Sequence, residues 1–460
     1  MTRAIVEFQH REPIGSSTFP MPGDLPELGL FEKALSTAEG ERNISTLYIH
    51  VPFCDRICSF CGFAKTVGDD EAKAAYIDAL LVEIGKYAAT KYVQSLSIDA
   101  VYIGGGTPNS LTAGQLWRVL AALRKLMPLS ADCEISVEGI LPNFDEARVE
   151  AMKLGGVNRV SAGVQTLSRR IRVEHLHMRD GREEVEGYVA RLRKHFDNFN
   201  LDFIYNLPGQ DDAIWKEDVA FAIGSGATHL THYPLTLLER TGLYSDYVKA
   251  GKHEAPDEGQ EIRQFDFVRT QMQSSRYTNQ YSVRDWSLPD RACRYIMLNA
   301  QANHVLALGV SGHGYLAGIT YRNQGSIPAY IDEVNSGKLP LQGMRVASLE
   351  ERMQRWMVMG LRLRERDTTD FAVRFGRTVI EAFGDRIDSM IDSGYLRMEG
   401  GVLSFTPRGD IWANNVRTVF EGNKNTAVGY MNTTGIDETG KSHYARISRI
   451  KASADVEAHS

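Results

Sequence analysis

The chain has 460 residues, of which 43% are hydrophobic and 24% are charged, and its net charge is −6. This composition is typical of a globular protein of up to about three domains. Its mildly negative net charge provides no positive electrostatic field that would attract nucleic acid. No apolar stretch approaches the ~18 residues of a membrane span, and the N-terminus lacks the apolar core of a secretory signal. We therefore expect a cytoplasmic protein without disulfides and without a nucleic-acid or membrane partner.

Residues 1–40 contain several prolines and glycines without a sustained period, which predicts an N-terminal extension. Between residues 41 and 340, short apolar runs alternate with helical patterns. The expected strands are 46–51, 100–105, 133–138, 158–164, 201–207 and 228–235, and the expected helices are 71–88, 114–126, 145–154, 182–195 and 213–224. This alternation predicts an α/β fold with a parallel sheet. About six units are fewer than the eight of a closed barrel, so we expect a partial, TIM-like (β/α)6 barrel.

The pattern changes beyond residue 341. Helices are expected at 347–363, 368–375 and 378–393, and Glu399-Gly400-Gly401 is a hairpin signal. These elements predict a helical, winged-helix-like C-terminal domain over 341–421, and the lack of a basic stripe favours a structural cap over a DNA-binding role. Residues 422–460 are polar and are expected to form a flexible tail.

Three of the five cysteines, Cys54, Cys58 and Cys61, form a C-x3-C-x2-C motif directly after the first expected strand. The carboxyl ends of parallel strands are the usual ligand-binding edge of such sheets. Iron–sulfur clusters normally take four thiolates, so three would leave one iron open to a small molecule. A zinc site is the alternative, although zinc sites usually have paired cysteines or four protein ligands. The spacing therefore predicts a metal site with one open position.

The segment YIHVPFCDRICSFCGFAK and the later GGGTPNSL at 104–111 together resemble the HemN-like branch of the radical S-adenosylmethionine (SAM) family. The resemblance implies a radical SAM barrel with a [4Fe–4S] cluster on Cys54, Cys58 and Cys61, whose open iron binds SAM. SAM is then cleaved to methionine and a 5′-deoxyadenosyl radical, so the cofactor carries the difficult chemistry. A small-molecule substrate and an electron donor such as flavodoxin or ferredoxin are implied as partners.

The resemblance also implies which residues contact SAM. Glu138 ends the third expected strand, Gln165 directly follows the fourth, and Asp202 lies at the start of the fifth. The implied set is Tyr48, Phe60, Gly105, Gly106, Thr107, Glu138, Gln165 and Asp202. The family usually has an arginine twelve residues after Gln165. This chain has His177 there, and Arg179 is the candidate replacement for contacting the methionyl carboxylate.

A glycine-rich segment at 306–316, LALGVSGHGYL, resembles the part of HemN-like enzymes that lines a second SAM site. Gly309 and Ser311 are its implied cofactor contacts. His313 is the candidate catalytic residue, because an imidazole can transfer protons near neutral pH. The alternative is an ordinary glycine-rich turn.

Within that family, the chain resembles the anaerobic haem-degrading methyltransferases. The segments that carry this likeness are CSFCGF, SVEG, NRVSAGVQT, the dipeptide DW at 285–286 and the R-x-x-R-Y segment at 291–295. This likeness implies a radical C-methyltransferase that uses two SAM molecules and adds a methylene radical to an sp2 carbon. Related members cyclopropanate natural products. The haem-degrading proteins typically read C-x-F-C-G-F-Y-x-N and E-G-R, whereas this chain has Ala64-Lys65 and Gly139-Ile140, so the substrate is either haem or an aromatic natural-product intermediate. The alternatives are a coproporphyrinogen III oxidase-like decarboxylase and a non-catalytic, haem chaperone-like protein.

Overall fold

The computed structural model describes residues 5–9, 11–12, 18–23, 27–38, 43–239, 241–249, 251, 257–279 and 284–422. The expected flexible tail therefore lies, apart from residue 422, outside the described residues. Among the helices within these ranges, none combines the length and the apolar character needed to cross a membrane.

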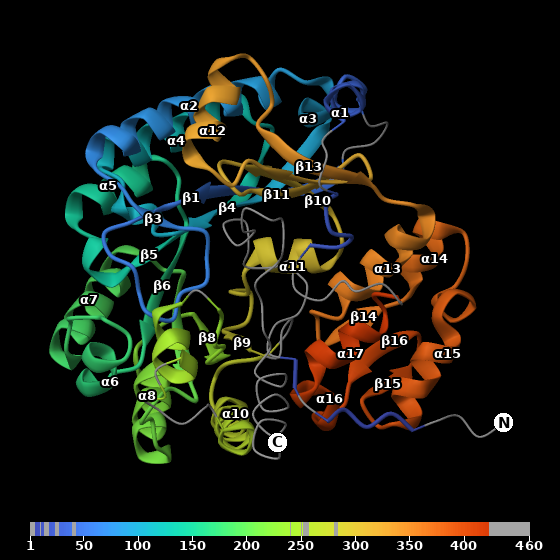
Figure 1. Cartoon of the computed structure of the whole chain (residues 1–460). Coiled ribbons are helices and arrows are strands. Elements are labelled where there is room, and N and C mark those ends of the chain that lie inside the picture. Colours follow the sequence, from blue (N-terminus) through green and yellow to red (C-terminus); the bar gives the residue numbers. More distant parts are fainter. Residues whose placement is uncertain are drawn as a thin grey trace, which may run out of the picture.

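One large sheet of 11 strands organises the molecule (Figure 1). Six neighbouring strands are parallel and correspond to the six expected from the sequence. They are β1 (Asn43–Val51), β4 (Leu96–Gly105), β5 (Leu129–Ile140), β6 (Arg159–Gln165), β7 (Phe199–Tyr205) and β8 (His229–Pro234). The partial (β/α)6 arrangement is thus confirmed.

Helices connect these strands at the expected positions. They are α2 (Asp70–Ala88), α4 (Ala113–Leu126), α5 (Glu146–Leu154), α7 (Arg182–His195) and α8 (Asp212–Gly224), with the short α3 (Lys91–Ser95) and α6 (Arg169–Glu174) beside them. Side chains cap most of their first turns: Asp69 accepts from the amide of Ala72, and Thr112 forms a reciprocal pair with Gln115. Such caps satisfy amides that have no partner inside the helix, which explains why these helices begin where they do.

Additional short strands extend the sheet at both edges, and these were not expected. At one edge β9 (Asp285–Ser287) runs antiparallel to β8. At the other, β10 (His304–Leu308) is parallel to β1, and β11 (His313–Leu316), β12 (Ile319–Asn323) and β13 (Leu341–Val346) continue antiparallel. The intervening helices are α9 (Gly242–Tyr244), α10 (Glu258–Gln273), α11 (Arg294–Ala300) and α12 (Ile327–Asn335). Strands of three to six residues carry little periodic signal, so their sequences did not reveal them.

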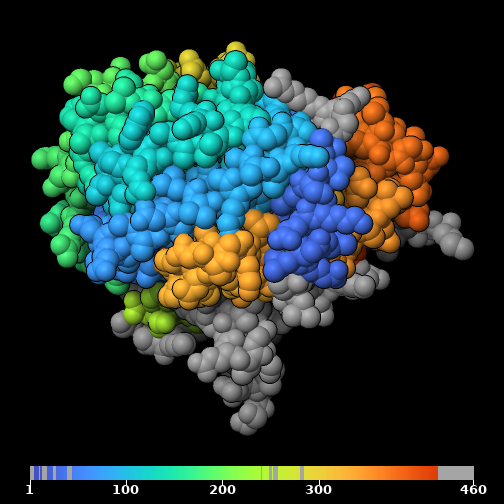
Figure 2. Space-filling model, turned by 90° about the horizontal axis from the view of Figure 1, so that it is seen from above, coloured from blue at the N-terminus to red at the C-terminus, as the bar shows by residue number. Residues whose placement is uncertain are grey.

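Helices from distant parts of the chain cover the face behind β1. Here α1 (Leu28–Leu35), α2 and α12 lie close together at the top of Figure 1, and Figure 2 shows this face from outside. Phe31 and Leu35 of α1 are buried in the same core as the barrel strands. The Lys86 ammonium on α2 donates to the carbonyls of Val334 (3.0 Å) and Lys338 (2.8 Å), which fixes α12 in place. Part of the expected N-terminal extension therefore packs into the barrel core.

The C-terminal region forms a second core beside the barrel (Figure 1, orange to red). Trp356, Phe371 and Ile387 are buried there. The expected helices and hairpin are confirmed as α13 (Leu349–Gly360), α14 (Thr369–Phe375), α15 (Val379–Asp392), β15 (Leu396–Glu399) and β16 (Val402–Phe405). Three further elements are β14 (Glu365–Asp367), which pairs with β16, and the helices α16 (Pro407–Ile411) and α17 (Ala413–Val419).

Candidate active site

The cysteine motif lies on a closed loop that leaves the C-terminal end of β1. Its ends pair as two short parallel strands, β2 (Phe53–Cys54) and β3 (Thr66–Val67), with Cys54 opposite Val67. Inside the loop, the Lys65 ammonium donates to the carbonyl of Cys61 (2.6 Å) and to that of Phe63 (3.2 Å). Lys65, one of the departures from the haem-degrading pattern, therefore stabilises the backbone conformation at Cys61.

The glycine-rich loop after β4 supports the cysteine loop from one side. The amide of Gly106 donates to the carbonyl of Val51, and that of Thr107 to the carbonyl of Phe53, both at 2.8 Å. A Cβ atom at Gly106 would lie 2.7 Å from the carbonyl oxygen of Pro52, so no larger residue fits. The Thr107 hydroxyl donates to the sulfur of Cys54 at 3.3 Å. The two sequence motifs thus form one structural unit.

The three thiols lie in a common, largely buried environment. Cys54 is buried, whereas Cys58 and Cys61 are partly exposed. Burial raises the pKa of Cys54 to about 12 and also raises the pKa of Cys58 and of Cys61, while the nearby charge of Lys65 lowers all three. Without a cation the thiols are consequently neutral, and a metal that binds them must displace their protons.

The donor set of three thiols suits an iron–sulfur cluster, whose usual protein ligands are thiolates. Among the residues the structure describes, no three histidine, cysteine or acidic side chains converge on one ion. Thiolates of a cubane cluster each bind a different iron, so they need not converge. Cys54, Cys58 and Cys61 would hold the cluster. When bound, the cluster supplies the electron that cleaves SAM to methionine and a 5′-deoxyadenosyl radical.

A cavity of about 490 Å³ opens beside Cys61, within the ring of strand ends. Its walls include seven of the residues predicted to bind ligands, namely Tyr48, Phe60, Cys61, Gly105, Glu138, Gln165 and Asp202. Side chains from β1, β4, β5, β6 and β7 thus meet at one cavity, as expected for the carboxyl edge of a parallel sheet. That these residues contact SAM remains a prediction.

The floor of the cavity is polar and was only partly foreseen. Asn200 is its centre: its amide nitrogen donates to the Asp202 carboxylate (2.8 Å), and its amide oxygen lies 2.5 Å from Nδ1 of His229. The Thr231 hydroxyl lies within hydrogen-bonding distance of two acceptors, the amide oxygen of Asn200 (3.1 Å) and the carboxylate of Asp285 (2.9 Å), and its one proton can be donated to either. Burial lowers the pKa of His229, so its ring is neutral near pH 7. The floor therefore combines acidic and amide acceptors with the guanidinium of Arg159, which lines the same cavity.

An aromatic wall rises next to this floor. The rings of Tyr48 and Tyr102 stack at 6.5 Å, and those of Tyr102 and Tyr295 lie 5.1 Å apart. All three line the cavity. Tyr102 gave no signal in the sequence, and Tyr295 is the tyrosine of the R-x-x-R-Y pattern. Such a wall favours a flat, largely apolar ligand beside the polar floor.

The arginine expected to replace His177 does not reach the cavity. Arg179 and His177 are both exposed, and neither lines it. A different arginine, Arg172 on α6, is buried and donates to the carbonyls of Val164 (2.5 Å) and Thr166 (3.1 Å) at the end of β6. No motif indicated Arg172, because its hydrogen bonds join α6 to the end of β6 and are evident only in the folded chain. The contact between Arg179 and SAM remains a prediction.

Gly309, Ser311 and His313 also lie outside the cavity lining. A Cβ atom at Gly309 would come within 2.5 Å of both the His50 carbonyl oxygen and the Tyr76 hydroxyl, so this segment packs behind β1. Nδ1 of His313 donates to the carbonyl oxygen of Ser311 at 3.0 Å, and burial lowers the pKa of His313 to about 4. The second SAM site and the catalytic role of His313 stay predictions.

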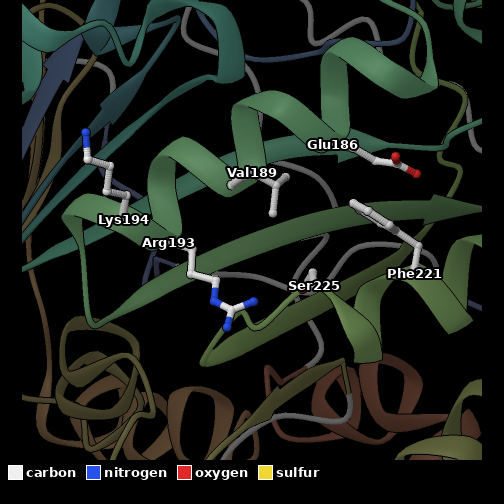
Figure 3. A pocket seen from close by; sticks show the side chains of 7 residues that line it. Glu186, Val189, Arg193, Lys194, Phe221 and Ser225 are labelled. Carbon is white, nitrogen blue, oxygen red and sulfur yellow. The ribbon is translucent and has the colours of Figure 1, made fainter.

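A second hollow, of about 440 Å³, lies on α7 and α8, with Glu186, Arg193 and Phe221 among its lining residues (Figure 3). None of the predicted ligand-binding residues lines it. The cavity beside Cys61 is therefore the candidate active site.

The cavity carboxylates predict a pH dependence of the cluster-free, SAM-free protein. Burial raises the pKa of Glu138 from 4.5 to about 8 and that of Asp202 from 3.8 to about 6. Folding therefore favours their neutral forms, and the stability this contributes is present at low pH and lost as pH rises through 6 and 8. We expect the free energy of unfolding of Glu138→Gln, relative to that of wild type, to increase by on the order of 3 kcal/mol from pH 5 to pH 9. Denaturant unfolding across this range measures the difference. The exposed Glu150→Gln variant is the control, and a Glu138→Gln difference that is constant with pH would contradict the expectation.

Comparison with known proteins agrees with this geometry. Residues 48–222 match the model of the radical SAM superfamily, and residues 347–411 match that of the HemN C-terminal domain. Anaerobilin synthase of Escherichia coli O157:H7 is 30% identical over 378 residues, which span 80% of this chain and 82% of that protein. Haem chaperone HemW of Lactococcus lactis subsp. lactis is 28% identical over 378 residues, spanning 81% of this chain and 96% of that protein.

The fold has a solved counterpart in coproporphyrinogen III oxidase (HemN) from Escherichia coli, described as a radical SAM enzyme. The two superpose with a TM-score of 0.76 at 20% identity, over 88% of this chain and 96% of that one. On the matching domains and the similarity to anaerobilin synthase, the chain belongs to the HemN-like family of radical SAM proteins, whose cofactors are a [4Fe–4S] cluster and SAM.

Proposed function

We propose that this protein is a radical SAM enzyme that transfers a SAM-derived one-carbon unit to an sp2 carbon of a haem-type tetrapyrrole and so opens the ring. The similarity to anaerobilin synthase over four fifths of both chains carries this proposal. The cavity supports it, because an aromatic wall of Tyr48, Tyr102 and Tyr295 faces the space next to Cys61 and suits a flat ring system. Two SAM molecules are consumed in each turnover, and flavodoxin or ferredoxin supplies electrons.

The products of a reconstituted reaction test this proposal. The holoenzyme is reduced anaerobically with dithionite, supplied with SAM and haemin, and analysed by liquid chromatography and mass spectrometry. We expect both 5′-deoxyadenosine and S-adenosylhomocysteine, together with a tetrapyrrole that has lost the haem absorbance and gained one carbon. Formation of 5′-deoxyadenosine alone would refute the two-SAM reaction. Unchanged haem would refute the choice of substrate and leave the aromatic natural product.

A haem chaperone is the second candidate, because HemW matches this chain over 96% of its own length. A chaperone would bind haemin stoichiometrically and return it unchanged. The same experiment separates the two, because only an enzyme consumes several haemin molecules per protein. The likeness to the HemN structure, at 20% identity, is evidence of the fold alone and adds no support for a decarboxylase.

A further inference from the structure

The C-terminal domain supplies one wall of the cavity beside Cys61. Leu361 and Arg362 follow α13 directly, and Ala413, Asn414 and Arg417 come from α17. The remaining walls belong to the barrel strands and the cysteine loop. A ligand that extends from the strand ends across the cavity therefore meets the C-terminal domain.

Arg362 stands out among the arginines of this domain. Its neighbours are paired: Arg364 lies 2.8 Å from the Asp410 carboxylate, and Arg366 lies 3.1 Å from that of Asp370. Arg362 is only partly exposed, and its guanidinium has neither a hydrogen bond nor an ion pair with any residue in the described ranges. Because Arg362 lines the cavity, an anionic ligand group could form a charge-assisted hydrogen bond with its guanidinium there.

Arg417 reinforces the positive charge of this wall. It is buried, its Nε donates to the carbonyl of Val358 at 2.9 Å, and one terminal nitrogen donates to the side chain of Asn414 at 3.3 Å. These contacts fix its guanidinium in the wall that also holds Arg362. The barrel side of the cavity carries both signs of charge, with the acidic side chains of Glu138, Asp202 and Asp285 beside Arg159 and Arg284, whereas none of the described residues that line the C-terminal wall is acidic. The C-terminal wall, with two arginines and no acidic residue among its described lining residues, therefore favours the anionic end of a ligand.

We propose that Arg362, assisted by Arg417, binds a carboxylate of the substrate and so orients its ring within the cavity. A guanidinium can bind a carboxylate through two parallel hydrogen bonds, which gives direction as well as affinity. The inference deepens the proposed function, on which it rests, because haem carries carboxylates at one edge of its ring. The ligand class is a flat, mostly apolar ring system with a carboxylate on one side.

Binding of haemin and of its dimethyl ester to the holoenzyme tests this proposal. We expect wild type to bind haemin about tenfold or more tightly than the ester, because the ester group has no negative charge and cannot form an ion pair with the guanidinium. In Arg362→Gln, haemin affinity should fall so that most of the preference over the ester is lost, while ester affinity stays the same. Arg362→Lys should be intermediate. The control is Arg352→Gln on α13, which removes an exposed arginine of the same domain and should keep the wild-type preference.

Three outcomes would overturn the proposal: equal affinity of wild type for haemin and ester, an undiminished preference for haemin in Arg362→Gln, or a parallel loss of affinity for both ligands in that variant. Turnover of the ester by wild type separates failure of the carboxylate site from failure of the proposed function. If both compounds bind equally and are both opened, the carboxylate site is wrong and the proposed function stands. If neither binds nor reacts, both are wrong.

Discussion

Replacing Cys58 by Ala is expected to abolish the visible absorbance of the cluster and all cleavage of SAM. Three thiolates are available in the loop between β2 and β3, and a cluster that already has one open iron cannot lose a further protein ligand and remain anchored. Cys54→Ala and Cys61→Ala should have the same effect. Iron and sulfide content, the absorbance spectrum after anaerobic reconstitution and the yield of 5′-deoxyadenosine measure it.

Cys133→Ala and Cys293→Ala are the matched controls. Both thiols are buried, but they lie near Glu134 rather than in the cysteine loop: the sulfur of Cys133 is 3.6 Å from the Glu134 carbonyl, and that of Cys293 is 3.6 Å from its carboxylate. These variants should keep the cluster and its activity. Cluster absorbance that persists in Cys58→Ala, or zinc in place of iron in the reconstituted wild type, would refute the assignment.

Replacing Glu83 by Ala is expected to destabilise the protein by about 3–5 kcal/mol, because it leaves several buried donors without an acceptor. Glu83 is fully buried on α2. Its carboxylate accepts from the amide of Gly309 (2.7 Å), the hydroxyl of Tyr330 (2.6 Å) and the side chain of Asn323 (2.7 Å). One side chain thereby joins α2, the turn after β10, β12 and α12 behind β1. Thermal and denaturant unfolding measure the loss.

Val82→Ala is the control for this prediction, since Val82 lies on the same helix and is 45% exposed. It should change the free energy of unfolding by less than about 1 kcal/mol. Glu83→Gln keeps one oxygen acceptor and should lie between Glu83→Ala and wild type. Burial raises the pKa of Glu83 to about 7, so folding favours its protonated form. The stability that this preference contributes is lost as pH rises through 7. Equal stability of Glu83→Ala and Val82→Ala would contradict the role of this network.

The sequence predicted most of the barrel because its elements are long and locally encoded. The strand and helix expected at 46–51 and 71–88 correspond to β1 and α2, with ends that differ by a few residues. Periodicity and capping residues act over one or two turns, so they can be recognised in a single chain. The strands β9 to β13 were missed, because short strands are stabilised by pairing with distant residues rather than by their own pattern.

The candidate site divides in the same way. Glu138 and Asp202 could be placed at one edge of the sheet because each falls on an expected strand. Tyr102 and Arg172 could not be found, because nothing in their neighbourhood along the chain distinguishes them from core or surface residues. Their positions follow from the packing of strands and helices that are far apart in sequence.

The sequence by itself determined the cysteine triad, the glycine-rich loop that supports it and the alternation of strands and helices, since all of these depend on residue type and short spacing. Only the tertiary structure decided which side chains share a cavity. It brought Arg362, more than 300 residues after Cys61, to the same cavity and left His313 packed outside its lining. Such placement depends on how two separately packed cores meet, and no local pattern in the chain encodes that contact.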